Sequence, residues 1–307
     1  MKMKFCLVIV LILVTALLLP SCSPFRSADN PAATDTGTKT PTEESGTKAP
    51  TEESTQSPSE SGAESTEANS ETESETIVLP AIPVRDPDAP LTVCIDAGHG
   101  YTDPGCTSTY LDGRFERDIV AEYAEVLKEK LEEMGYRVIL LRDDDVYIDA
   151  GKILQTAKEF GMSILEDKLV DDGRFAPYNR SVWANVLHRE TYIDLFVSLH
   201  IDAFDSMESV RGTRIYYCTE TPYSADSEKL CAALSSAVVE ALPETNARSF
   251  PKTASEAYVV TKHTEMPSVL VEMGFATNPD DAENILSEEW RDSFCDAIAR
   301  GIKTYAE

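Results

Sequence analysis

The sequence is poor in basic residues, and this shortage excludes two kinds of binding partner. Its 307 residues include 27 Lys and Arg against 54 Asp and Glu, which gives a formal charge of −27, and only four His. Nucleic-acid binding needs clustered cations that neutralise phosphates, so this composition excludes it. The same shortage excludes adhesion to anionic lipid head groups through a basic face.

The sequence also lacks an apolar run of the roughly 20 residues that a transmembrane helix needs. Its apolar run at 5–19 follows two lysines and leads into Leu19–Cys22, which reads Leu-Pro-Ser-Cys. A basic start, a short apolar stretch and small residues before a break are typical of a secretory signal. Leu19–Cys22 resembles the bacterial lipobox, whose cysteine receives a diacylglyceryl group and becomes the mature N-terminus, although Pro20 departs from the usual pattern.

We therefore predict that residues 1–22 are a lipoprotein signal peptide and that Cys22 is lipidated. The protein would then be exported and anchored through its N-terminal lipid to the outer face of the bacterial cytoplasmic membrane, facing the cell wall. An uncleaved signal anchor is the alternative, and it tethers the chain to the same side.

Residues 23–78 contain almost no apolar material and are dominated by Ser, Thr, Glu, Pro and Ala. A nine-residue unit is repeated at 37–45 and 46–54, and Phe25 is the only aromatic residue. Such a segment cannot bury enough apolar surface to offset the entropy of ordering it. We predict a disordered linker that lets the folded part work at some distance from the bilayer.

Cysteines are too few and unevenly placed for a disulfide framework. Residues 79–307 contain an odd number, and several stand inside apolar strand or helix patterns, which favours buried thiols. At most two disulfides could form from this set: Cys94, Cys106, Cys218, Cys231 and Cys295.

Residues 79–307 alternate short β-branched runs with stretches of helical periodicity. This alternation predicts an α/β fold, with a mostly parallel or mixed central sheet of about six strands and helices on both faces. The expected strands are 91–96, 136–142, 194–199, 213–218, 257–261 and 268–272, and the expected helices are 119–134, 179–190, 225–242 and 288–305.

Four polar residues stand near strand ends, where α/β sheets gather their functional sites. His99 lies in a glycine-rich turn after the first strand, His200 and Glu272 follow later strands, and Glu116 begins the first helix. Two imidazoles and a carboxylate from separate elements are how catalytic zinc is held. Each residue alone also has a structural explanation, and the spacing does not decide between a zinc site and a coincidence.

The order of the motifs carries a family resemblance over nearly all of residues 91–305. Residues 95–100 (IDAGHG), 115–118 (FERD), 197–200 (VSLH) and 270–278 (LVEMGFATN) resemble the successive motifs of the zinc-dependent N-acetylmuramoyl-L-alanine amidases of the amidase-3 type. Arg142, and Arg180 with Asn185, fit the same pattern. The resemblance implies that His99, Glu116 and His200 bind one Zn²⁺ and that Glu272 is the catalytic carboxylate.

The resemblance further implies the reaction, which is hydrolysis of the amide between N-acetylmuramic acid and L-alanine of the stem peptide. The partner is then peptidoglycan, with its glycan strand and stem peptide, and an activating protein is left open. A cationic side chain would help to stabilise the oxyanion, and Arg248 is one candidate. Of the other two histidines, we expect His188 on a helix surface and His263 in a loop, neither as a metal ligand.

Two features depart from the family pattern. Asp202 stands where the family commonly has Asn, so an amide donor is lost there. The connection at 143–179 is longer than usual and contains an amphipathic stretch, which we interpret as an inserted helical flap that shapes or gates the cleft. A peripheral decoration is the alternative for this insertion. The amphipathic residues are Ile153, Leu154, Ala157, Phe160, Met162 and Leu165.

Two other functions compete with this interpretation. One is a lipid-tethered protein that binds wall or solute without catalysis, for which neither a bound metal nor a carboxylate at Glu272 is needed. The other is a decayed amidase that binds wall without cutting it, which is disfavoured because all four candidate positions are intact.

Overall fold

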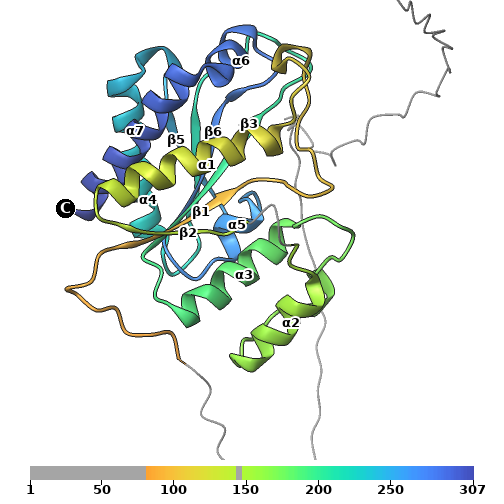
Figure 1. Cartoon of the computed structure of the whole chain (residues 1–307), viewed down its shortest axis with the longest axis vertical. Coiled ribbons are helices and arrows are strands. Elements are labelled where there is room, and N and C mark those ends of the chain that lie inside the picture. The colour runs from red at the N-terminus through yellow and green to blue at the C-terminus, as the bar shows by residue number, and fades with distance from the viewer. Residues whose placement is uncertain (1–80, 143–146) are drawn as a thin grey trace, which may run out of the picture. The chain divides into compact units, whose positions relative to one another are not determined.

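The computed structural model describes residues 81–142 and 147–307, so the predicted signal peptide and the whole of the predicted linker lie outside the described residues. The described chain is built around a six-stranded sheet with helices on both sides (Figure 1). The predicted α/β fold is thus confirmed. The strands are β1 (Thr92–Ala97), β2 (Arg137–Leu140), β3 (Leu195–Asp202), β4 (Arg214–Cys218), β5 (Arg248–Lys252) and β6 (Ser268–Phe275). The helices are α1 (Glu116–Glu133), α2 (Ala150–Glu159), α3 (Pro177–Glu190), α4 (Ser224–Ala241), α5 (Val259–His263), α6 (Pro279–Leu286) and α7 (Glu288–Ala306).

The strand order, β2-β1-β3-β6-β4-β5, brings the ends of distant segments to one edge of the sheet. Neighbouring strands are parallel except for β4 and β6, which are antiparallel. The carboxyl ends of β1, β3 and β6 therefore meet at the same edge as the amino ends of β4 and β5. In sheets of this kind that edge is where sites form.

Alternation along the strands divides the core into two layers. On β3, Leu195, Val197 and Leu199 pack with α1, α4 and α7, whereas Phe196 faces the layer that contains α3 and α5. Beyond Phe196 this second face becomes polar, with Ser198 and then His200. The first face therefore supplies the larger core, and the second carries functional side chains.

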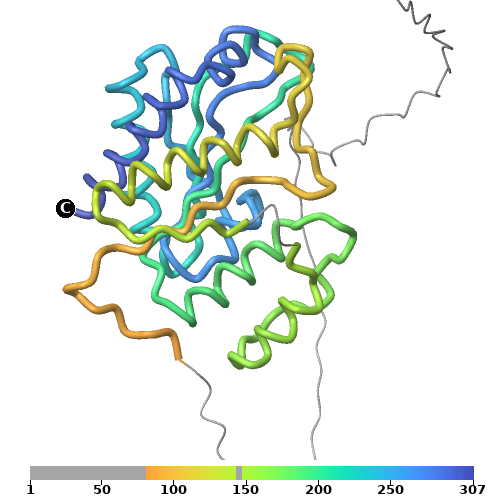
Figure 2. The backbone as a smooth tube through the Cα atoms, in the orientation of Figure 1, coloured from red at the N-terminus to blue at the C-terminus, as the bar shows by residue number. Residues whose placement is uncertain are grey.

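The inserted segment forms a helix of its own. α2 begins at an N-cap, Asp149, whose carboxylate accepts from Lys152 N, and it buries Ile153 and Ala157. In Figure 2 α2 lies beyond α3 and away from the sheet. The predicted amphipathic helix is present, but it contacts α3 more than the rest of the fold.

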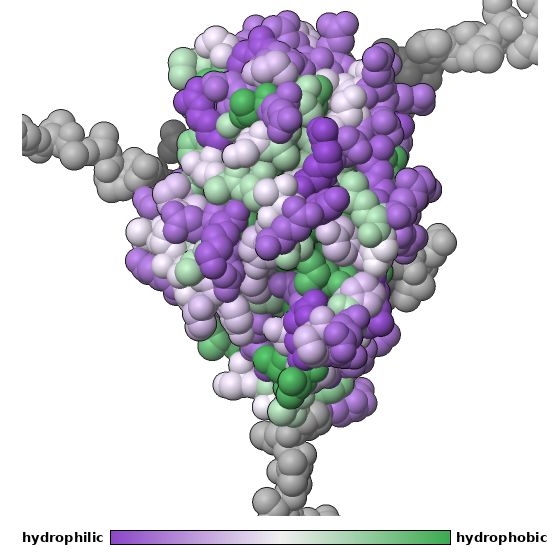
Figure 3. Space-filling view, turned by 90° about the vertical axis from the view of Figure 1, so that its left-hand side faces the viewer, coloured by the Kyte–Doolittle hydropathy of each residue, from purple (hydrophilic) through white to green (hydrophobic). Residues whose placement is uncertain are grey.

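The surface agrees with the acidic composition. The face in Figure 3 is mainly hydrophilic, and its apolar residues form small separate patches. Within the described ranges no helix is both long enough and apolar enough to cross a membrane. The five cysteines of this part of the chain are all free, and all but Cys106 are buried, in line with the interpretation as buried thiols.

One predicted strand, 257–261, is wrong because tertiary contacts override its β-branched sequence. The segment forms the short helix α5, which packs on α3. Ser181 Oγ donates to Val259 O and Asn185 Nδ2 donates to His263 O, so α3 satisfies carbonyls of the short helix. His263, expected in a loop, thus ends α5.

The sheet still has six strands, because the structure contains a strand that the sequence pattern did not predict, β5. Its sequence, Arg-Ser-Phe-Pro-Lys, has little apolar character and contains Pro251, which is tolerated because β5 is an edge strand. The pattern also missed α6, although Asn278 and Pro279 form a recognisable start: the Asn278 side chain accepts from Asp281 N.

His188 is buried, and the expectation that it lies on a helix surface is wrong. Its side chain has 3% exposure, and Nδ1 accepts a hydrogen bond from Ile193 N at 2.9 Å. Burial, together with the charge of Arg189, lowers the pKa of His188 to about 4. The folded state therefore holds this imidazole neutral.

We expect His188 to make folding sensitive to acid. Its folded pKa is about 4 and its unfolded pKa is about 6.5, so its contribution is full above pH 6.5 and is lost as pH falls towards 4. The shift corresponds to about 3 kcal/mol. Urea unfolding of the wild type and of His188→Gln at several pH values measures this contribution. The difference in unfolding free energy between the two proteins should shrink between pH 6.5 and 4, and a constant difference would contradict the assignment.

Candidate active site

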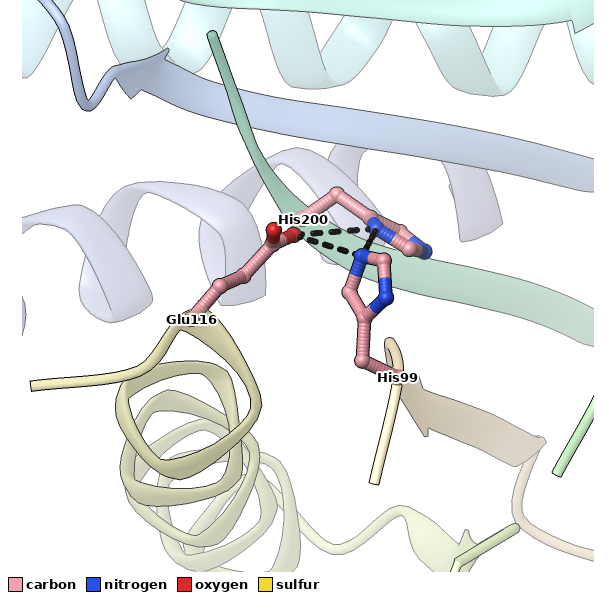
Figure 4. Close-up of side chains that lie close together, drawn as sticks. All are labelled: His99, Glu116 and His200. Carbon is pink, nitrogen blue, oxygen red and sulfur yellow. Dashed lines mark hydrogen bonds and ion pairs between the residues drawn. The ribbon is translucent and has the colours of Figure 1, made fainter. Parts of the chain in front are cut away.

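Three of the predicted site residues converge at the carboxyl edge of the sheet (Figure 4). His99 Nε2 and His200 Nδ1 each lie 3.1 Å from Glu116 Oε1, and the two nitrogens are 3.2 Å apart. The three atoms thus form a nearly equilateral triangle. Among the described residues this is the group suited to hold a metal ion.

The loop after β1 presents His99 in an uncommon backbone conformation. His99 and Tyr101 have φ values of 59° and 52°, in the left-handed region that non-glycine residues rarely adopt. Such a conformation persists only where surrounding contacts enforce it. Here the enforcing contacts come from a buried arginine, Arg180 of α3.

Arg180 fixes the chain on both sides of the turn. Its guanidinium forms a buried ion pair with Asp96 and donates to Ala97 O and His99 O. Asp96 in turn accepts from Ser198 Oγ at 2.7 Å. The network therefore ties β1, α3 and β3 together beneath His99 and sets where its ring can lie.

Glu116 is the first residue of α1 and has 1% exposure. Its carboxylate accepts from Ile201 N at 2.9 Å and from Cys106 N at 2.7 Å. Burial raises the pKa of Glu116, but hydrogen bonds from His200 and His99 outweigh it, and the net pKa is well below the usual range. The side chain is an ionised, fixed ligand.

His200 reaches the triangle from β3 because the chain opposite it is glycine. A Cβ on Gly98 would lie 2.3–2.6 Å from atoms of the His200 ring. Immediately after His200, between His200 and Asp202, the pairing of β3 with β6 changes register. Only a glycine leaves room for the ring here.

Asp103 orients the ring of His99. His99 Nδ1 lies 3.1 Å from Asp103 Oδ2, so a proton on Nδ1 is held by Asp103 when Nε2 gives up its own proton to bind a metal ion. Burial lowers the pKa of His99, while hydrogen bonds to Asp103 and Glu116 outweigh it and raise the pKa to about 9. A metal ion must therefore displace a proton to bind at this site.

The triangle fits zinc in size and in ligand type. Zinc takes His nitrogen and carboxylate oxygen at about 2.0–2.2 Å, and tetrahedral angles then place neighbouring ligand atoms about 3.3–3.6 Å apart. The observed edges of 3.1–3.2 Å are close to that spacing. Three protein ligands leave one position open, which is typical of catalytic sites.

Glu272 lies beside this triangle on β6, in register with His200 of β3. It has 6% exposure, and Glu272 Oε2 has no hydrogen-bond partner among the described residues. Burial and the charges of Asp202 and Glu116 raise its pKa well above the usual value for a glutamate. A buried carboxyl with a free oxygen and a raised pKa is suited to proton transfer.

Comparison with known proteins decides the family. The sequence profile described as Amidase_3, N-acetylmuramoyl-L-alanine amidase, matches residues 93–304. The chain belongs to this amidase family. As a member of this family, the protein is a peptidoglycan hydrolase with a metal-binding site. Because it is a cell-wall amidase, it acts outside the cytoplasm.

Curated relatives agree with the family. The amidase is 32% identical over 227 residues to the uncharacterized protein YqiI of Bacillus subtilis, with coverage of 74% of this chain and 90% of YqiI. It is 29% identical over 222 residues to the N-acetylmuramoyl-L-alanine amidase LytC of Bacillus subtilis, with coverage of 72% of this chain and 37% of LytC. The chain spans 90% of YqiI and between about a third and 60% of several other curated relatives.

Solved structures share the fold. The N-acetylmuramoyl-L-alanine amidase of Clostridium difficile 630 is 24% identical, with a TM-score of 0.55 and coverage of 71% of this chain and 97% of that one. The CwlD amidase of Clostridioides difficile, solved in complex with the GerS lipoprotein, is 25% identical, with a TM-score of 0.51 and coverage of 70% and 98%.

The triad and Glu272 of this amidase open into one cleft of about 570 Å³. The lining of the cleft includes the acidic residues Asp103, Asp202 and Glu256. Its apolar part comes from the end of the inserted segment and from the start of α5, with Phe175, Pro177, Tyr258, Val259 and Val260. The insertion thus contributes to the cleft through its last residues and not through α2.

Arg248 does not line the cleft of the amidase, and its suggested role at the oxyanion is not supported. It lies on β5, two strands away from Glu272. Arg180 lines the cleft, and Arg214 of β4 lies nearer to it than Arg248 does, because Arg214 pairs with Glu272 in the strand register and its Nη1 lies 3.9 Å from Asp202 Oδ2. The sequence did not reveal Arg214, because its role follows from the antiparallel pairing of β4 with β6.

Proposed function

We propose that this amidase hydrolyses the bond between N-acetylmuramic acid and L-alanine with one zinc ion, held by His99 Nε2, Glu116 Oε1 and His200 Nδ1. The observation that carries the proposal is the triangle of these three atoms beside the buried carboxyl of Glu272, within one cleft. Bound zinc supplies Lewis-acid chemistry, which acidifies water and polarises the scissile carbonyl.

Glu272 is the general base and then the general acid in this proposal. Its ionised form accepts a proton from the attacking water, and its protonated form delivers that proton to the departing alanine nitrogen. An ordinary glutamate is too weak a base at neutral pH, and the raised pKa of Glu272 brings it nearer to the pH at which the enzyme works. The unpartnered Oε2 is free to hold and pass on the proton.

The remaining residues of the cleft hold the reacting groups in place. Asp103 and Arg180 orient His99, and the backbone N–H groups of Cys106 and Ile201 fix Glu116. Apolar residues of the cleft lining, among them Phe175 and Tyr258, reduce the amount of water around the scissile bond. Because these supports are buried or rigid, binding does not have to organise the site.

The location of the enzyme follows from its N-terminal sequence. We infer that Cys22 is lipidated and that residues 23–78 tether the catalytic part to the outer face of the cytoplasmic membrane. The support is the sequence Leu19–Cys22 after a basic and apolar leader. With the lipid as anchor, the chain needs no transmembrane helix.

If Cys22 is lipidated, partitioning of the protein into detergent and its labelling by fatty acid should both depend on Cys22. Full-length protein expressed in a bacterium should partition into the detergent phase and incorporate labelled fatty acid. Cys22→Ser should lose both. Equal labelling of the two proteins would rule out Cys22 as the acceptor.

The experiment for the reaction is digestion of purified peptidoglycan by the full-length protein, with and without a metal chelator, followed by mass spectrometry. We expect new free L-alanine amino ends beside intact glycan strands, and no products when the chelator is present. Reducing sugars in place of free amino ends would refute the amidase assignment. Binding of wall without products would support the tethered binding protein instead.

A further inference from the structure

A second pocket, of about 330 Å³, lies at the same edge of the sheet and has arginines in its lining. Three of its lining residues are arginines, from the segment before β4, from β4 and from β5, in a chain with a formal charge of −27. The lining residues are Ser209, Val210, Arg211, Thr213, Arg214, Asn246, Arg248 and Phe250.

The strand register puts two of these arginines in line with the catalytic centre. His200 pairs with Glu272, Glu272 pairs with Arg214, and Arg214 pairs with Arg248. The four residues form a row across β3, β6, β4 and β5. Neighbouring strands are about 4.8 Å apart, so Arg248 begins about 10 Å from Glu272 along this row.

Arg214 is held rigidly between the cleft and the second pocket. Its guanidinium carbon lies 4.4 Å from the ring centre of Phe275 and 5.6 Å from that of Phe250. Arg214 Nη1 lies 3.9 Å from Oδ2 of Asp202, which lines the cleft. A guanidinium stacked on aromatic rings loses little entropy when it binds a further partner.

Arg248 carries a charge that the described part of the chain leaves without a counter-ion. Arg211 pairs with Asp280 and Asp281, whereas Arg248 makes no ion pair among the described residues. Its contact is to the side-chain oxygen of Asn246, in the amide orientation that satisfies both groups, with Nε at 3.2 Å. Arg214 has Asp202 as its counter-ion, whereas Arg248, paired with it on β5, can take a bound anion as its charge partner.

We propose that this pocket binds a carboxylate on the peptide part of the substrate, at the second residue of the stem. This inference rests on the proposed function, because it takes the scissile amide to lie beside Glu272. Two residues of extended chain span at most about 7 Å, and the long arginine side chain covers the remaining distance to the row. Guanidinium groups match a carboxylate in geometry as well as in charge.

The chemistry selects peptidoglycan in which that carboxylate is free. The second stem residue is a glutamate joined through its side-chain carboxyl, so its main carboxyl is either free or amidated. A carboxamide keeps the shape and loses the charge. The amidase should therefore prefer stems with the free acid, and the preference should depend on Arg248.

The test compares two muramoyl tripeptides that differ only in a carboxylate or a carboxamide at the second stem residue. For the wild type we expect the carboxamide to have about a tenfold higher KM at similar kcat, the lower range for a charge-assisted hydrogen bond at an exposed side chain. In Arg248→Gln the two substrates should become equivalent, through a rise in KM for the carboxylate. Arg300→Gln removes one exposed arginine on α7 and should keep the wild-type preference.

Binding without turnover separates this inference from the proposed function. The dissociation constants of both tripeptides are measured on Glu272→Gln and on Glu272→Gln combined with Arg248→Gln. Tighter binding of the carboxylate that disappears with Arg248 supports the pocket, whether or not hydrolysis is seen. Equal binding of the two tripeptides to Glu272→Gln overturns it. Inorganic phosphate, added as a competitor, would overturn the carboxylate assignment if it bound through Arg248 while the tripeptides bound equally.

Discussion

Replacing Glu272 by Gln is expected to lower kcat for amide hydrolysis by two to four orders of magnitude, which is the scale of general acid–base catalysis. Gln has nearly the same shape but cannot accept the proton of the attacking water. The position is buried in register with His200, and its Oε2 makes no hydrogen bond to the described residues, so the substitution breaks no structural contact there. Steady-state kinetics on a soluble muramoyl peptide measures the loss.

Zinc content and thermal unfolding provide the control for this substitution. Both should match the wild type, because Glu272 is not a member of the triangle. Glu125→Gln, an exposed carboxylate on α1 that pairs with Lys128, should keep normal kinetics. Activity of Glu272→Gln within tenfold of the wild type would remove Glu272 from the mechanism.

Replacing His200 by Ala is expected to abolish both zinc retention and activity. One vertex of the triangle is then lost, and Glu116 loses the hydrogen bond from His200 that helps to keep it ionised. Zinc affinity should fall by well over the 10- to 100-fold that removal of a supporting hydrogen bond costs. Elemental analysis after dialysis and competition with a chromogenic chelator measure the affinity directly.

Two further variants, one with an intermediate expected effect and one with none, are compared with His200→Ala for zinc affinity. Asp103→Asn keeps the three ligands but weakens the hydrogen bond that orients His99, so affinity should drop about 10- to 100-fold. His263→Ala removes a histidine of α5 that lies outside the triangle and should leave zinc binding unchanged. Equal zinc binding by His200→Ala and His263→Ala would disprove the proposed ligand set.

The residues of the triangle could be found from the sequence because their signals are local. His99 stands in a glycine turn after a buried strand, Glu116 opens a helix, and His200 follows an apolar run. Parallel strands bring such positions to one edge whatever the details of packing. The family resemblance then selected these positions from several structural explanations.

The remaining parts of the site depend on contacts that no local pattern encodes. α5 is helical because Ser181 and Asn185 of α3 satisfy its backbone, which overrides a β-branched sequence. Arg214 joins the site only because β4 runs antiparallel to β6. His188 is buried because of the chain that follows its helix, which meets it through Ile193 N.

The proposed reaction requires that His99, Glu116 and His200 bind one zinc ion beside Glu272. Anomalous diffraction from crystals of the purified protein, recorded on both sides of the zinc absorption edge, tests it most directly. We predict a single strong peak about 2.0–2.2 Å from His99 Nε2, Glu116 Oε1 and His200 Nδ1. A zinc-loaded crystal with no peak at this triangle, or with its metal bound by other residues, would contradict the account.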